Sequence, residues 1–243
     1  MDGIPPRRGG PLGQAEGMVR PAACLFDLDG LLLDTEPLHA RAWREAAAHF
    51  GRELSAAELM QLRGRRRLDC AEQVREWIAA ASEHGGAAAS GDPPSIEALL
   101  AVRQPIAEAL LVHAEPMAGA PELVRRCADL AIPMALATSS SRAAVALKAA
   151  PHPWLELITI RVHGDDPELL AGKPAPDVFL LAAARLGVPP RECWAFEDSL
   201  AGAQAAAAAG CRVHVLPPPG ETCTAYPPGA LHLRSLHEVV DSL

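Results

Sequence analysis

The chain lacks several features that would indicate a membrane or nucleic-acid protein. Its 243 residues contain no apolar run of about 18 residues, so no membrane span is expected. The formal net charge of −8 argues against a nucleic-acid surface, because such surfaces bind by neutralising phosphates. The first twenty residues have no apolar signal-peptide core, and their proline and glycine content predicts a disordered lead-in.

Cysteine pairing and aromatic content are also limited. None of the six cysteines forms a CxxC pair, so neither a zinc site nor a disulfide framework is expected. We therefore predict reduced thiols and a cytoplasmic protein. Aromatic residues contribute 4% although 49% of the chain is hydrophobic. Alanine and leucine supply most of the apolar mass, which favours helices packed on a sheet.

Lysine is the rarest of the basic residues. Lysine and arginine together number 22, and the only lysines are Lys148 and Lys173, which leaves twenty arginines. Lys173 stands between a glycine and a proline, in a segment expected to be a stiff loop.

The stretch from Cys24 to His39 carries the first chemical signal. A short apolar run, Ala22 to Phe26, predicts a buried parallel strand, and Asp27, Asp29 and Gly30 follow it directly. Residues two apart in a strand point the same way, so the two acids are expected to leave the strand end together. A divalent cation such as Mg²⁺ would relieve their repulsion. The alternative is a capping aspartate followed by a turn aspartate.

The rest of the chain divides into an all-helical block and an alternating part. Between Pro37 and His113 the patterns predict helices and no strand, with capping boxes at Ser55 and at Asp69. Beyond Pro116, helices alternate with apolar strands. The predicted strands are 132–137, 157–162, 193–196 and 213–216, and the predicted helices between them are 121–130, 141–150, 177–186 and 199–209. This pattern predicts an α/β fold, a Rossmann-like three-layer parallel sheet with an inserted helical block.

Polar residues follow three of these strands. Asp27 and Asp29 follow the strand 22–26, Thr138 and Ser139 follow the strand 132–137, and Glu197 and Asp198 follow the strand 193–196. Ligands of open α/β sheets bind at the carboxyl ends of the strands, so these residues are expected to meet Asp27 and Asp29.

Four motifs in this order resemble the haloacid dehalogenase-like (HAD) phosphatase superfamily. They read FDLDG, ALATSSS, GKPAPDVF and FEDSLAG, and the resemblance covers about residues 22–216. The segments DTEPLH and FEDSLAGAQAAAAAG look most like the beta-phosphoglucomutase and pseudouridine-5′-phosphatase branch. Composition predicts a disordered lead-in at 1–20, and the resemblance implies a catalytic core at 21–35 and 115–243 with a helical cap at 36–114.

The resemblance also implies residue roles. Asp27 would be the nucleophile and Asp29 the general acid and base. Thr138 and Lys173 would assist catalysis. The phosphoryl group would be bound by Ser139, and the rest of the substrate by His39 and Arg67. The implied Mg²⁺ ligands are Asp27, the Asp29 backbone carbonyl, Glu197 and Asp198.

Each role has a structural alternative. Glu197 and Asp198 could cap the following helix, Thr138 could be a simple helix cap, and Lys173 could be a solvated surface residue. We interpret Asp165 and Asp166 as structural.

The implied activity is a Mg²⁺-dependent phosphatase of sugar, polyol or nucleotide monophosphates that acts through an aspartyl-phosphate. Two alternatives stay open, a phosphomutase of the beta-phosphoglucomutase type and a non-catalytic phosphate-sensing protein. Such mutases rely on a cap lysine, and residues 36–114 contain none. The expected partner is a small phosphorylated metabolite, bound by a monomer or weak dimer.

Overall fold

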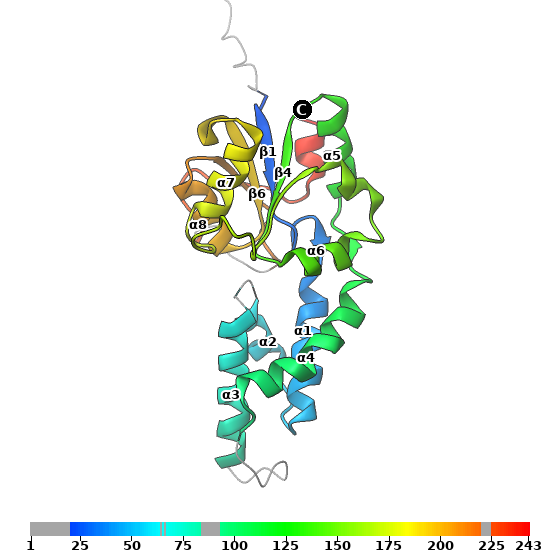
Figure 1. The fold of residues 1–243 in the computed structure, drawn as a ribbon, viewed down its shortest axis with the longest axis vertical. Helices are drawn as coiled ribbons and strands as arrows, with labels where there is room; N and C mark the ends of the chain where they lie inside the picture. The colour runs from blue at the N-terminus through cyan, green and yellow to red at the C-terminus, as the bar shows by residue number, and fades with distance from the viewer. Residues whose placement is uncertain (1–19, 64, 66, 84–92, 220–224) are drawn as a thin grey trace, which may run out of the picture.

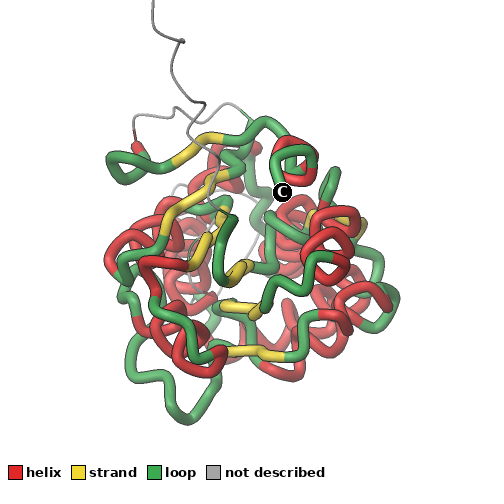
Figure 2. The backbone as a smooth tube through the Cα atoms, turned by 90° about the horizontal axis from the view of Figure 1, so that it is seen from above, coloured by secondary structure: helices red, strands yellow, loops and turns green. Residues whose placement is uncertain are grey.

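A six-stranded parallel sheet forms the centre of the upper lobe in Figure 1 and is seen from above in Figure 2. The computed structural model describes residues 20–63, 65, 67–83, 93–219 and 225–243. The strand order is β5-β4-β1-β6-β7-β8, and every neighbouring pair is parallel. The strands are β1 (Ala23–Phe26), β4 (Met134–Ala137), β5 (Ile160–Val162), β6 (Cys193–Glu197), β7 (Arg212–Val215) and β8 (Leu231–His232). The predicted three-layer α/β fold is therefore confirmed.

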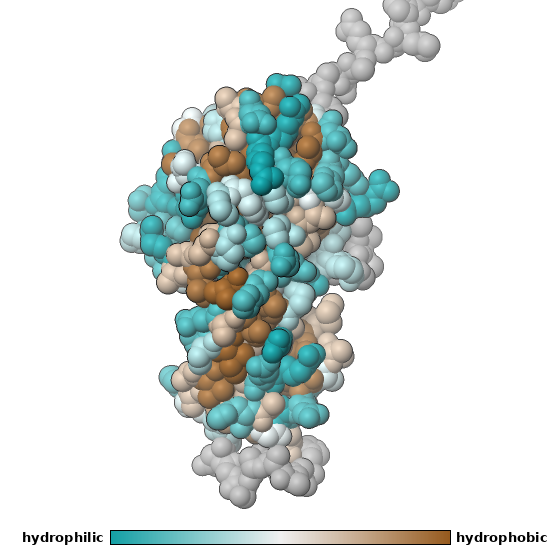
Figure 3. Space-filling view, turned by 90° about the vertical axis from the view of Figure 1, so that its right-hand side faces the viewer, coloured by the Kyte–Doolittle hydropathy of each residue, from teal (hydrophilic) through white to brown (hydrophobic). Residues whose placement is uncertain are grey.

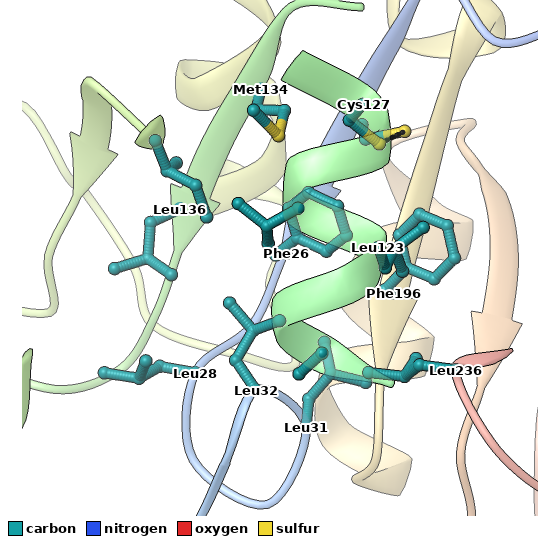
Figure 4. Packing of buried hydrophobic residues seen from close by; sticks show 14 of the residues in the cluster. Phe26, Leu28, Leu31, Leu32, Leu123, Cys127, Met134, Leu136, Phe196 and Leu236 are labelled. Atoms are coloured by element: carbon teal, nitrogen blue, oxygen red, sulfur yellow. Dashed lines mark hydrogen bonds between the residues drawn. The ribbon is translucent and has the colours of Figure 1, made fainter. Parts of the chain in front are cut away.

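Helices cover both faces of the sheet because successive side chains of each strand point to opposite sides. Ala23 and Leu25 of β1 join the apolar cluster that α7 and α8 cover, whereas Cys24 and Phe26 join the cluster under α5 and α9. Phe26 stacks on Phe196 of β6 with ring centroids 5.0 Å apart, and Figure 4 shows both rings against α5. The core helices are α5 (Ala120–Asp129), α6 (Arg142–Ala149), α7 (Asp177–Leu186), α8 (Leu200–Ala208) and α9 (His237–Val240).

Four helices, α1 to α4, form a separate lobe below the carboxyl edge of the sheet (Figure 1). They are α1 (Glu36–His49), α2 (Ala56–Leu62), α3 (Arg67–Glu83) and α4 (Ile96–Leu111), and they enclose an apolar cluster of their own. The chain enters this lobe after β2 (Leu33–Asp34) and leaves it before β3 (Glu115–Pro116). The two short strands pair antiparallel, so the two connections lie side by side. This pair was not predicted.

Local signals placed most helix ends correctly. Ser55 and Glu58 form the predicted capping box at the start of α2, and α7 has the predicted bounds. The capping box at Asp69 was wrong, because α3 begins at Arg67 and leaves Asp69 in its first turn. Acidic residues are favoured in the first turn by the helix dipole as well as at the N-cap. The sequence pattern at Asp69 therefore fits either position.

The predicted strand 157–162 was too long. Leu157 belongs to a short 3₁₀ helix, η1 (Pro153–Leu157), and only Ile160–Val162 pairs with β4. Likewise, β4 begins at Met134 rather than at Ile132. Ile158 before β5 and Ile132 before β4 are buried against the core without joining the ladder, and burial alone produces the same apolar sequence pattern. Leu157 is exposed.

The surface mixes polar and apolar residues over both lobes. Figure 3 shows apolar side chains that extend from the lower edge of the sheet lobe onto the helical lobe. None of the helices in the described ranges combines the length and apolar content needed to cross a bilayer. The predicted disordered lead-in falls outside the described residues, except for Arg20.

Candidate active site

The ends of two adjacent strands, β1 and β6, bring the predicted acids together. Asp27 follows β1 directly, and its backbone N–H donates to the Phe196 carbonyl of β6 at 3.0 Å. Glu197 is the last residue of β6, and Asp198 follows it. Gly30 adopts a φ of +86°, and a Cβ there would collide with the Asp198 carboxylate. A glycine is therefore required where the β1 loop passes the acidic residues.

Lys173 links two of these acids. Its Nζ donates to Asp27 Oδ1 and to Glu197 Oε1, each at 2.5 Å, and all three side chains are buried. The predicted alternative of a solvated lysine is therefore wrong. Burial lowers the pKa of Lys173, but the charges of Asp27 and Glu197 outweigh that effect and raise it above its usual value.

The cluster contains more negative charge than Lys173 can offset. Burial, together with Glu197 and Asp29, raises the pKa of Asp27 to about 7 even though Lys173 opposes the rise. Burial and the charges of Glu197 and Asp27 raise the pKa of Asp198 well above its usual value. The pKa values of Lys173 and Asp27 are both raised because several carboxylates surround one ammonium. The surplus negative charge favours the protonated form of each group.

These acids fit a hard divalent cation. Asp27, Glu197 and Asp198 each offer a carboxylate oxygen, and the three oxygens lie within 4.8 Å of one another. Oxygen donors of this kind suit Mg²⁺, and a cation would offset the excess charge. Glu197 also accepts from the backbone N–H groups of Asp198 and Ser199 immediately before α8, and this contact with the start of the helix is compatible with binding of a cation. A Cβ on Gly202 of α8 would collide with this carboxylate.

The second aspartate of the motif has a different cationic partner. Lys148 of α6 donates to both carboxylate oxygens of Asp29 at 2.6 Å, and Ser140 donates to Asp29 Oδ2 at 2.7 Å. Burial raises the pKa of Asp29, but Lys148 and His39 together outweigh it and lower the pKa well below the usual value. Sequence reasoning did not assign Lys148 or Ser140. The scarcity of lysine was the only signal that could have found Lys148.

His39 connects the helical lobe to Asp29. Its Nε2 lies 3.8 Å from Asp29 Oδ1, and its Nδ1 lies 3.1 Å from Arg103 Nη2 in α4. A guanidinium can only donate, so His39 Nδ1 accepts and the ring hydrogen lies on Nε2, toward Asp29. Arg103 is 5% exposed, stacks on Trp43 at 4.2 Å, and its Nε has no hydrogen-bond partner. Arg103 was not predicted.

The other predicted site residues, Thr138, Ser139 and Arg67, differ in burial and in their hydrogen-bond partners. Thr138 is buried at the end of β4, and its hydroxyl accepts from the Ser140 backbone N–H at 3.1 Å. Ser139 is exposed, and its carbonyl packs closely on Gly164. Arg67 is exposed at the start of α3 and donates to Gln104 of α4 at 3.1 Å, not to the acidic cluster.

Asp165 and Asp166 have the structural contacts expected of them. Asp166 pairs with Arg185 of α7 at 2.7 and 2.9 Å. Asp165 accepts from the backbone N–H of Arg142 at the start of α6 at 2.8 Å.

Residues 21–210 match the family model described as haloacid dehalogenase-like hydrolase. The chain belongs to this family. The Drosophila melanogaster protein named "Probable pseudouridine-5'-phosphatase" is 38% identical over 200 residues, which cover 81% of each chain. "Fructose-1-phosphate phosphatase YqaB" of Escherichia coli is 36% identical over 193 residues, 79% of this chain and 94% of the relative.

A solved structure has a similar fold. CbbY from Rhodobacter sphaeroides in complex with phosphate superposes with a TM-score of 0.70 at 30% identity, over 90% of this chain and 96% of that one. The predicted family and branch are thereby confirmed, and so is the prediction of a phosphoric monoester hydrolase.

Proposed function

We propose that this HAD-like hydrolase is a Mg²⁺-dependent phosphatase that cleaves small phosphate monoesters through an aspartyl-phosphate on Asp27. The observation that carries the proposal is the bridge from Lys173 to Asp27 and Glu197, with Asp198 completing the cluster at the strand ends. The similarity to proteins named as phosphatases of pseudouridine 5′-phosphate and fructose 1-phosphate supports the substrate class.

The reaction proceeds in two steps. Asp29 is a carboxylate in the free protein, so it takes up a proton from solvent before the first step. Asp27 Oδ then attacks phosphorus, the bond to the leaving oxygen breaks, and Asp29 donates its proton to this oxygen. Asp29 then removes a proton from water, the hydroxide oxygen bonds to phosphorus, and the bond to Asp27 breaks. Bound Mg²⁺, held by Asp27, Glu197, Asp198 and the Asp29 carbonyl, would supply electrostatic stabilisation of the phosphoryl oxygens.

The neighbouring residues bind the phosphoryl group. In this proposal the Thr138 hydroxyl and the Ser139 backbone N–H donate to phosphoryl oxygens, and Lys173 offsets charge on Asp27 and on the transferring group. Their position at the carboxyl edge of β4 and beside Asp27 supports these roles.

The helical lobe, residues 36–114, acts as a cap in this proposal, and residues 21–35 and 115–243 form the catalytic core. His39 supports this division, since it reaches from α1 to within 3.8 Å of Asp29. Arg67 would contact a second anionic group of the substrate, although its present partner is Gln104.

The setting of the enzyme is proposed from the same observations. A small phosphorylated metabolite is the partner, and nucleic acid and membranes are not. We further propose a cytoplasmic monomer or weak dimer. Reduced thiols fit this compartment, and the buried thiols of Cys24 and Cys127 lie 3.8 Å apart without a disulfide.

A panel of phosphate monoesters tests the activity. We expect phosphate release from sugar, polyol or nucleotide monophosphates in the presence of Mg²⁺ and little release after chelation. The absence of release from every ester would favour a phosphate-sensing protein. Interconversion of glucose 1- and 6-phosphates in a coupled assay would instead indicate a mutase.

If Arg67 binds a second anionic group of the substrate, Arg67→Ala will raise KM only for bisphosphates.

Metal binding should also be visible without turnover. Mg²⁺ at about 100 times its dissociation constant should stabilise the fold by about 2.7 kcal/mol, since it offsets the excess charge of the cluster. For a chain of this size that raises Tm by roughly 5–10 °C. Asp198→Asn should remove most of the shift, whereas Asp129→Asn, the same change at an exposed position of α5, should preserve it. An undiminished shift in Asp198→Asn would exclude Asp198 as a ligand.

A further inference from the structure

Lys148 is a buried ammonium whose hydrogen-bonding capacity is used completely. Its side chain is 1% exposed, and it has three acceptors: the two Asp29 oxygens at 2.6 Å and Ser140 Oγ at 2.7 Å. An ammonium has three N–H groups, so each finds one acceptor. The Ser140 hydroxyl in turn donates to Asp29 Oδ2 at 2.7 Å. The three side chains therefore form a closed group that fixes the Asp29 carboxylate.

Burying this ammonium is costly. Moving a charged side chain out of water is unfavourable even after relaxation, and a well-packed apolar residue would often be at least as stable. The other twenty Lys/Arg positions are all arginine, whereas both lysines are buried and each contacts a different aspartate of the DxD motif. Lysine supplies a compact point charge, whereas arginine has a broad planar head. At both positions the side chain is tightly enclosed, and its one positive charge lies against an aspartate carboxylate.

We infer that Lys148, assisted by Ser140, is a positioning residue for Asp29. It holds the carboxylate in one orientation through hydrogen bonds to both of its oxygens. The two neighbouring aspartates can then remain close with separate tasks. The inference rests on the proposed function, in which Asp29 handles the proton of the leaving alcohol. A purely structural ion pair, one that only ties α6 to the loop after β1, is the alternative.

The leaving group of the substrate separates these two roles. An alkyl phosphate releases a basic alkoxide that needs a proton, whereas p-nitrophenyl phosphate releases a weakly basic phenolate that does not. In a two-step mechanism kcat/KM reports on events up to formation of the aspartyl-phosphate. A residue that acts through Asp29 should therefore affect kcat/KM for the alkyl ester much more strongly.

The experiment compares Lys148→Met with the unsubstituted protein on glycerol 3-phosphate and p-nitrophenyl phosphate in saturating Mg²⁺. We expect kcat/KM to fall at least about 100-fold for the alkyl ester and less than about tenfold for the aryl ester, the range typical of general acid catalysis. Asp29→Asn should show the same selectivity. The double variant should be no worse than Asp29→Asn alone, because residues acting as one unit are not additive.

Two further variants guard against a folding defect. Ser140→Ala removes one hydrogen bond to Asp29 without leaving a charge unpaired, and it should show the same selectivity with a smaller loss. Arg185→Met removes the ion pair to Asp166 and should change both substrates equally, if at all. Equal losses for both esters in Lys148→Met and Ser140→Ala, or additivity with Asp29→Asn, would overturn the inference. Failure of the unsubstituted protein to hydrolyse either ester would overturn the proposed function itself.

Discussion

Asp27→Asn is expected to reduce phosphate release by at least about 10⁴-fold, which is typical for loss of a nucleophile. An amide oxygen is a far weaker nucleophile than a carboxylate, and it is also a weaker ligand for Mg²⁺. The geometry around the residue should persist, since an asparagine can still accept from Lys173, which bonds Asp27 at 2.5 Å. Steady-state kinetics on the best substrate of the panel measures the effect.

The fold of Asp27→Asn should be intact. The folded-state pKa of Asp27 is about 7, above its usual 3.8, so the folded protein binds this proton more tightly than the unfolded chain. Ionisation of Asp27 therefore reduces stability as the pH rises from about 4 to 7. At pH 8 without Mg²⁺, Asp27→Asn should melt no lower than the parent protein. Exposed Asp129→Asn should retain full activity, and full turnover by Asp27→Asn would refute the nucleophile assignment.

Lys173→Met is expected to reduce both stability and activity. The substitution leaves the buried Asp27 and Glu197 carboxylates without their shared ammonium, and breaking a buried ion pair from one side costs about 3–5 kcal/mol. The loss of a preorganised positive charge beside the phosphoryl group should lower kcat by about 10²–10³-fold. Denaturant unfolding at pH 8 and steady-state kinetics measure the two effects.

The origin of the lost stability can be tested with a compensating substitution. Adding Glu197→Gln to Lys173→Met neutralises one of the two abandoned acids and should recover part of the lost stability. Saturating Mg²⁺ should also recover part of it, because the cation offsets the same charges. Arg125→Met, which removes a positive charge from an exposed position of α5, should leave stability nearly unchanged. If Lys173→Met is as stable as the parent, the bridge is not a folding determinant.

Much of the fold and the core of the site was predictable from local signals. Alternating apolar strands and capped helices identify a parallel α/β sheet, and α7 has the predicted bounds because Asp177 and Gly187 mark both of its ends. Acids and hydroxyls placed directly after strands meet because parallel strands end at one edge. The contact of Lys173 with Asp27 followed from the resemblance of its loop, not from any periodicity.

The partners of Asp29 were decided only by the tertiary structure. Lys148 lies 119 residues from Asp29 and occupies an ordinary position in an alanine-rich helix. Its side chain reaches the aspartate because α6 packs beside the loop that follows β1. Likewise, Arg103 and His39 come from helices that meet only when the four-helix lobe packs. The sequence by itself determined which groups leave the strand ends. Long-range packing decided which cation neutralises which carboxylate, since charge pairing depends on distance in space and leaves no local pattern in the chain.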